Sequence, residues 1–160
     1  MITNQPGVAI SDYPLLTVEK ANEVCLYVIK ILKDMGGHID GHFLCPHATP
    51  DYVKSKPGVN FSQELVHECK CLKPELGMVF NAFKAEGLTP ENSRVYVIGD
   101  RASDVQTGLN VGGVGVLVPF INEPDEENKV KRLKDQSRVY VANDFLDAAQ
   151  FISNKERHAY

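Results

Sequence analysis

Strand-like and helical runs alternate through the C-terminal half of this chain, and this alternation limits the possible folds more than any other feature. Arg94 to Ile98 is a β-branched and aromatic run that leads directly into Gly99-Asp100. Asp104 to Val111 then has helical spacing, and Val114 to Val118 and Val139 to Val141 are further strand-like runs. Such spacing predicts βα units with a mostly parallel sheet, in which ligands bind at the carboxyl ends of the strands.

The N-terminal half continues the pattern with a longer helix. Thr17 to Met35 is amphipathic, with Thr17 as its N-cap and Gly36-Gly37 after its last residue. His42 to Leu44 is a short strand candidate, and Glu75 to Glu86 is a second helix. The apolar stripe of the first helix, which we expect to face the core, comprises Val18, Ala21, Val24, Cys25, Val28, Ile31, Leu32 and Met35.

Size and composition fit one ordinary globular domain. The chain has 160 residues, 43% hydrophobic and 24% charged, and we expect one domain over residues 1–152 and a tail over 153–160. Asn143 or Asp144 caps the last helix, expected to end at Ile152, after a solvated connection over 123–138. The net charge of −4 argues against nucleic-acid binding. No apolar run approaches the roughly 18 residues of a membrane span, and the N-terminus lacks the pattern of a signal peptide. We therefore expect a cytoplasmic protein.

Three of the four cysteines lie close to a histidine in the sequence, in a Cys-x-His pair and a Cys-x-Cys pair. A disulfide framework is not expected in a chain of this size without an export signal, so this pattern favours a closed tetrahedral zinc site. The expected ligands are Cys45, His47, Cys69 and Cys71. Zinc would pin both ends of the long loop over residues 45–71, and His67 is a competing ligand.

A second candidate site follows the strand-like run that ends at Gly99. Asp100 falls at the strand end and Asp104 one turn into the following helix. Carboxylate oxygens in this position suit Mg²⁺, which would neutralise phosphate charge. The structural alternative is that Asp100 is a turn residue and that Asp104 is a first-turn acid favoured by the helix dipole.

Polar residues near the N-terminus form a weaker phosphate-binding candidate. Thr3 and Asn4 precede Gln5-Pro6-Gly7 at the end of a short strand-like run. Their hydroxyl and amide groups, with nearby backbone N–H donors, are suited to hold a phosphate. Lys73 would place a cation beside it. Taken alone, the first segment is also an ordinary turn and Lys73 an ordinary surface lysine.

In this order, the motifs resemble those of the haloacid dehalogenase superfamily. They are Thr3-Asn4-Gln5-Pro-Gly, Cys45-Pro-His47, Cys69-x-Cys71-x-Lys73-Pro and Gly99-Asp100-x-x-x-Asp104. The resemblance covers roughly Met1 to Ile152 and is strongest to the branch of histidinol-phosphatases and D-glycero-D-manno-heptose 1,7-bisphosphate 7-phosphatases. Asn-Gln-Pro-Gly-Val-Ala favours the heptose phosphatases and Gly-Asp-Arg-Ala-Ser-Asp the histidinol-phosphatases. We favour the first.

The resemblance implies a three-layer, Rossmann-like α/β domain that hydrolyses a small phosphorylated sugar through an aspartyl-phosphate with Mg²⁺. Its oligomeric state does not follow from the sequence, and we expect a monomer if the chain folds. It assigns a catalytic role to Thr3 and Lys73. Phosphate binding is assigned to Thr3, Asn4, Lys73 and Arg101. Asp100 matches the Mg²⁺ ligand and Asp104 its supporting acid. The structural zinc ligands of the branch match Cys45, His47, Cys69 and Cys71.

Two departures from the family pattern limit the functional prediction. Leu72 stands where this branch usually has an arginine, which removes a bidentate phosphate or substrate contact. The family's first motif, Asp-x-Asp-Gly-Thr, supplies the aspartyl nucleophile and the general acid, and it does not occur in this sequence. Asp12, followed by Tyr13-Pro14, is in the wrong context to replace it.

Met1 aligns with the end of the family's second strand, so the first strand, the first helix and most of the second strand are expected to be missing. A truncated gene product or an internal start is the hypothesis that explains this alignment. We expect little or no turnover from the chain as printed. The alternatives are a non-catalytic zinc-containing module that binds phosphate or a partner, and a fragment that does not fold cooperatively.

Overall fold

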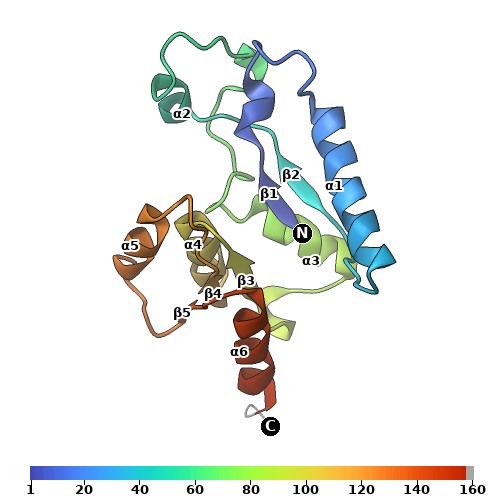
Figure 1. The fold of residues 1–160 in the computed structure, drawn as a ribbon, viewed down its shortest axis with the longest axis vertical. Helices are drawn as coiled ribbons and strands as arrows, with labels where there is room; N and C mark the ends of the chain where they lie inside the picture. The colour runs from blue at the N-terminus through green and yellow to red at the C-terminus, as the bar shows by residue number, and fades with distance from the viewer. Residues whose placement is uncertain (158–160) are drawn as a thin grey trace. The chain divides into compact units, whose positions relative to one another are not determined.

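The computed structural model describes residues 1–157, which fall into two compact units, Met1–Glu86 and Gly87–Tyr160 (Figure 1). The strands of each unit pair in parallel, as the sequence predicted for an α/β fold. The single domain expected over residues 1–152 stays a prediction. Within the expected tail, residues 153–157 belong to a helix, and the rest of the tail lies outside the described residues.

The first unit contains a β-α-β arrangement. β1 (Ile2–Asn4) pairs with β2 (Phe43–Cys45), with Thr3 opposite Leu44. Between them the chain forms a 3₁₀ turn, η1 (Pro6–Ala9), and the long helix α1 (Val18–Asp34). The hydroxyl of Thr17 accepts a hydrogen bond from the Lys20 N–H at 3.2 Å, and Gly36 follows the helix with φ of 87°. The predicted helix, its N-cap and its glycine stop are confirmed.

The apolar stripe of α1 is buried only in part. Ala21 and Cys25 are each 6% exposed, whereas Val24 is 54% and Met35 79% exposed. The expectation that the whole stripe faces the core is therefore wrong. The reason is length: seventeen helical residues extend about 25 Å, while each three-residue strand of this unit covers only about 10 Å.

The segment over residues 45–71, expected as an irregular loop, contains short helices and shares a small apolar core with residues 9–10. Its elements are α2 (Pro50–Lys54) and η2 (Gln63–Leu65). Thr49 caps α2 by accepting from the Tyr52 N–H at 3.1 Å. The core contains Ala9, Ile10, Ala48 and Phe61. Burial of these apolar side chains thus orders a segment whose composition had indicated a loop.

Helix α3 (Gly77–Glu86) packs against β2 and starts two residues later than expected. The Gly77 N–H donates to the Lys70 carbonyl at 2.7 Å, and a Cβ at position 77 would lie 2.4 Å from that oxygen. This close approach fixes the chain immediately before the helix. Met78 and Val79 supply its buried face.

The second unit is a parallel sheet with helices on both faces. The strands, in spatial order, are β3 (Tyr96–Gly99), β4 (Val114–Leu117) and β5 (Val139–Val141). On one face, Val105 of α4 (Ala102–Asn110) and Val130 of α5 (Asp125–Lys131) pack with Leu117. On the other face, Ala148 of α6 (Phe145–Arg157) packs with Val116. This unit therefore has the three layers expected from the resemblance.

Two details of the second unit differ from expectation. The connection over 123–138 contains α5, whose Val130 is fully buried, because one apolar residue within a charged run is enough to seat this short helix. The last helix continues past Ile152 to Arg157, and Asp144 caps it by accepting from the Asp147 N–H at 2.8 Å. The strand before α4 starts at Tyr96, after a short 3₁₀ turn, η3 (Pro90–Asn92), capped by Thr89. No helix in residues 1–157 has the length and apolarity to cross a bilayer.

Candidate functional site

The four predicted zinc ligands lie together in the first unit. Their ligand atoms all fall within 4.8 Å of one another. The Cys45 Sγ at the end of β2 lies 3.6 Å from the Cys69 Sγ and 2.8 Å from the Cys71 Sγ. The His47 Nδ1 lies 3.6 Å from the Cys45 Sγ and 3.1 Å from the Cys71 Sγ. A cluster of three sulfurs and one imidazole nitrogen therefore joins β2 to the segment that precedes α3.

This donor set fits a tetrahedral zinc ion. With Zn–S near 2.3 Å and Zn–N near 2.0–2.1 Å, neighbouring ligand atoms of a tetrahedron lie roughly 3.5–3.8 Å apart. The distances between neighbouring ligand atoms here, 2.8 to 3.6 Å, need only a small expansion to reach this range. The competing ligand, His67, lies outside the group, although its ring centroid is 4.3 Å from that of His47.

Burial shifts the titration of the cluster. It raises the pKa of the Cys45 thiol, with a further contribution from the hydrogen bond to Cys71. Burial also lowers the pKa of His47, and the neighbouring His67 adds to this effect. His47 is therefore neutral at physiological pH, which is the form that binds metal, while a divalent cation would have to displace the proton of Cys45.

The polar residues of β1 and Lys73 also come together. The Asn4 Oδ1 accepts from the Lys73 N–H at 2.9 Å, and the Asn4 Nδ2 donates to the Lys73 carbonyl at 3.2 Å. The Lys73 Nζ donates to the Ile2 carbonyl at 3.4 Å. The Thr3 Oγ1 accepts from the Gln5 Nε2 at 3.0 Å. Asn4 thus holds the Lys73 backbone against the end of β1 through both of its amide atoms.

Leu72 and Asp12 are the residues considered above where the sequence departs from the family pattern, and both belong to the first unit. Leu72 is half-buried. Asp12 is exposed and accepts from the Asn60 backbone N–H and the Asn60 Nδ2, both at 2.9 Å. The backbone hydrogen bond from Asn60 is the main cause that lowers the pKa of Asp12. Asp12 ties two loops together, a structural role that fits its unsuitable sequence context.

In the second unit, the predicted Mg²⁺ residues follow β3. Asp100 is exposed, and Asp104 is buried at 4% exposure. The Asp104 Oδ2 accepts from the Arg101 N–H at 3.1 Å, in the position of a helix cap. A Cβ at Gly99 would lie 2.2 Å from this oxygen, so a glycine is required for the carboxylate to reach over the strand end. Asp104 is thus a first-turn acid of α4, as the structural alternative expected.

Two acids that sequence reasoning missed, Glu123 and Glu126, contact the residues at the start of α4. The Arg101 Nη2 lies 2.6 Å from the Glu123 Oε1, and its Nε lies 3.8 Å from the Asp100 Oδ2. The Glu126 carboxylate accepts from the Ala102 N–H at 2.6 Å and pairs with Lys129 at 2.5 Å. Burial alone would raise the pKa of Glu126, but these hydrogen bonds outweigh it and lower that pKa. An acidic run over residues 123–127 was the only sequence signal for these contacts.

Comparison with known proteins gives a family model and curated relatives that match this chain. A HAD-hydrolase-like family model matches residues 70–148. The histidine biosynthesis bifunctional protein HisB of Blochmanniella floridana is 30% identical over 116 residues, which are 72% of this chain and 27% of that protein. The D-glycero-β-D-manno-heptose-1,7-bisphosphate 7-phosphatase of Helicobacter pylori is 30% identical over 110 residues, 69% of this chain and 52% of that protein.

The crystal structure of the D,D-heptose 1,7-bisphosphate phosphatase of B. bronchiseptica, complexed with magnesium and phosphate, has the same fold. Its TM-score is 0.65 at 22% identity, over 96% of this chain and 73% of that one. This likeness shows the fold, and the family model and the curated relatives show that the chain is similar to proteins of the haloacid dehalogenase superfamily.

Within that superfamily, the chain is similar to the branch that its motifs indicated, with heptose-bisphosphate 7-phosphatases and HisB proteins as its relatives. It spans about half or less of the length of the two curated relatives described above.

Proposed function

We propose that this chain carries the phosphate-binding and metal-binding part of a phosphomonoester hydrolase that acts on a phosphorylated sugar. The observation that carries the proposal is the Asn4–Lys73 contact. Its two hydrogen bonds, at 2.9 and 3.2 Å, connect residues 69 positions apart. They bring together two segments that the superfamily resemblance had assigned to one phosphate.

Three residues of the first unit would have different roles in binding phosphate. The Lys73 ammonium supplies a positive charge to the phosphate and to the charge that develops during transfer. The Thr3 hydroxyl accepts from Gln5 and keeps a proton to donate to a phosphate oxygen. Asn4 acts as a positioning residue, because both of its amide atoms are used to hold the backbone of Lys73. Direct phosphate binding by Asn4 and by Arg101 stays a prediction.

Asp100 would hold Mg²⁺, with Asp104 as its supporting acid. Hard carboxylate oxygens are the ligands that this ion prefers, and Asp100 is exposed at the carboxyl end of a parallel strand. Bound Mg²⁺ would supply neutralisation of phosphate charge. The magnesium and phosphate in the B. bronchiseptica phosphatase support this assignment.

Zinc would have a structural role. Cys71 lies two residues before Lys73, so a metal that fixes Cys71 to Cys45 also fixes the start of the lysine segment against β2. The closed set of four protein ligands leaves no position for substrate, as is typical of structural rather than catalytic zinc.

The proposed substrate is a heptose bisphosphate, by similarity to the H. pylori and B. bronchiseptica enzymes. Histidinol phosphate is the second candidate, because the HisB match has the same 30% identity. No aspartyl nucleophile of the Asp-x-Asp-Gly-Thr type occurs in the printed sequence. For a polypeptide of these residues we therefore expect phosphate binding without turnover. The cytoplasmic location and the monomeric state stay predictions.

The test is a calorimetric titration of the zinc-loaded 160-residue chain with inorganic phosphate, in the presence and absence of Mg²⁺. Lys73→Ala removes the proposed phosphate cation and should weaken binding about tenfold, as loss of a charge-assisted contact does. Lys70→Ala is the matched control, because Lys70 is an exposed lysine of the same segment, and it should bind like the unmodified chain. Equal affinity of the two variants would overturn the proposal. A steady release of phosphate from a sugar phosphate would overturn the prediction of no turnover.

A further inference from the structure

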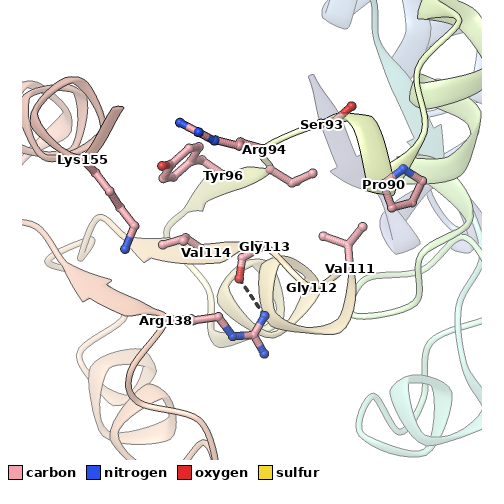
Figure 2. Close-up of a pocket in the computed structure, with 11 residues that line it drawn as sticks. Pro90, Ser93, Arg94, Tyr96, Val111, Gly112, Gly113, Val114, Arg138 and Lys155 are labelled. Carbon is pink, nitrogen blue, oxygen red and sulfur yellow. Dashed lines mark hydrogen bonds between the residues drawn. The ribbon is translucent and has the colours of Figure 1, made fainter. Parts of the chain in front are cut away.

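A pocket of about 270 Å³ lies within the second unit, at the amino ends of its strands (Figure 2). Tyr96 and Val114 are the first residues of β3 and β4, and Arg138 directly precedes β5. Asp100 follows the opposite end of β3. At about 3.3 Å per residue, Asp100 lies roughly 13 Å along the chain direction from Tyr96. Within this unit, the pocket is therefore separate from Asp100, the residue proposed to hold Mg²⁺.

Part of its wall is backbone without side chains. Gly112 has φ of 84°, in the left-handed region that favours glycine. At Gly113, a Cβ would lie 2.3 Å from the Val95 carbonyl oxygen. The two glycines after α4 thus turn the chain tightly, and Val95, Val111 and Val114 supply apolar lining beside them.

Three cationic side chains line the same pocket: Arg94, Arg138 and Lys155. Figure 2 shows that they come from three separate segments. The Arg138 Nη1 donates to the Gly113 carbonyl at 3.0 Å, the bond drawn in the figure, and its Nε pairs with Asp135 at 2.8 Å. Arg138 is thereby held in place by the chain that follows α4, where the helix dipole also favours a cation.

Two carboxylates among the described residues pair with these cations. Arg94 pairs with Glu156 at 2.6 Å, and the Tyr96 hydroxyl donates to the same carboxylate at 2.6 Å. Lys155 is exposed, with its Nζ 5.7 Å from the centre of the Phe151 ring. Among residues 1–157, three cations and two paired carboxylates, Asp135 and Glu156, therefore surround an apolar hollow.

We propose that this pocket binds a small organic anion with an apolar body, such as an aryl phosphonate or carboxylate. The valines and the Tyr96 ring would contact the body, and the cations at the rim would contact the acid group. Its volume is slightly below the 300–1,000 Å³ or so of typical small-molecule sites, so the ligand is the size of a single ring with one acidic substituent.

The experiment is a titration of the ¹⁵N-labelled 160-residue chain with phenylphosphonate, followed by amide chemical shifts. Phenylphosphonate is not a phosphate ester, so hydrolysis does not complicate the readout. We expect saturable shifts at residues 94–96 and 111–114, with an affinity of about 1 mM, ordinary for one small fragment. Lys155→Gln should weaken binding about fivefold, and Lys155→Arg should restore it.

The matched control is Lys131→Gln, which removes the same charge from an exposed lysine of α5 that does not line the pocket. It should leave the affinity unchanged. No saturable shift at residues 94–96 and 111–114 overturns the proposal, and so does an equal loss of affinity in Lys155→Gln and Lys131→Gln, which would indicate a bulk charge effect. Shifts confined to residues 3–4 and 72–74 would support the proposed phosphate site while overturning this one, so the two proposals fail separately.

Discussion

The two units of this protein are ordered by different kinds of interaction. In the second, both faces of a three-stranded sheet are covered, and side chains such as Leu117 and Val116 are fully buried. In the first, two strands of three residues each support a long helix whose apolar stripe remains largely exposed. What joins the distant parts of the first unit is a set of polar groups: the Cys/His cluster and the Asn4–Lys73 contact.

This difference indicates which single changes should disrupt the candidate site most. Apolar burial is spread over many contacts, so the second unit should lose stability in proportion to the area removed. The polar connections of the first unit are few, and each closes a long stretch of chain, so loss of one should release a whole segment. The predictions below test this contrast, and residue-resolved amide exchange is the common measurement because it reports the two units separately.

The largest effect is expected from removal of zinc. Chelation, or Cys71→Ser, should unfold the segment over residues 45–71, because the free energy of binding a structural metal is folding free energy, of the order of 10 kcal/mol in small zinc domains. Amide exchange in this segment should accelerate at least a hundredfold while the amides of β4 stay protected. Cys25→Ser is the control, since Cys25 lies on α1 outside the cluster and the variant should still bind one zinc per chain. Equal exchange with and without metal would contradict the zinc assignment.

A core truncation should give the next effect, in the second unit alone. Leu117→Ala removes a fully buried side chain between α4 and α5, and we expect it to lower the free energy of unfolding by about 3 kcal/mol. Leu146→Ala is the control, because Leu146 is 66% exposed and its truncation should cost less than about 0.5 kcal/mol. If Leu117→Ala accelerated exchange over residues 45–71 to the same extent as in β4, the two units would not be energetically distinct.

Most of the second unit could be predicted from the sequence because its signals are local. The β-branched run before Gly99, the helix after it and the glycines at 112 and 113 define each element within a few neighbouring residues. The short helix α5 was missed for the same reason, since a single buried apolar residue, Val130, does not produce a helical pattern in a charged run.

The first unit was harder to predict because its order comes from contacts between distant residues. The motif pattern did bring Cys45 to Cys71 and Asn4 to Lys73. It gave no indication of the small core around Ile10 and Phe61, whose residues belong to segments about 50 positions apart. Glu123, which pairs with Arg101, and Glu126, which bonds to the Ala102 N–H, were missed because an acidic run in a sequence looks the same whether or not its members have partners.

The pH dependence of the second unit should depend on Glu126. The folded protein lowers its pKa from the ordinary value of 4.5, so this carboxylate contributes stability above the ordinary pKa that is lost as the pH falls through the folded value. Glu126→Gln should cost about 1–3 kcal/mol at neutral pH, because it removes a charged acceptor from the Ala102 N–H. The stability of the Glu126→Gln variant should then fall less than that of the unmodified chain as the pH drops below about 5.

The control for this prediction is Glu127→Gln. Glu127 pairs with Lys131 at 2.7 Å, and its side chain is 42% exposed, so its removal should change stability by less than about 0.5 kcal/mol and leave the pH profile unchanged. Parallel acid profiles for Glu126→Gln and the unmodified chain would show that another group controls the acid sensitivity of the second unit.

The smallest stability effect, and the most informative for function, is expected from Asn4→Ala. Two hydrogen bonds to the Lys73 backbone are lost, at a cost of about 1–2 kcal/mol. The zinc cluster should remain, because none of its ligands contacts Asn4 through these bonds. Exchange should therefore accelerate near Lys73 while the bound zinc stays constant, and phosphate affinity should fall because the ammonium loses its fixed position. Asn154→Ala, on an exposed position of α6, should change neither quantity. If Asn4→Ala bound phosphate as tightly as the unmodified chain, Asn4 would be a purely structural link between β1 and the lysine segment.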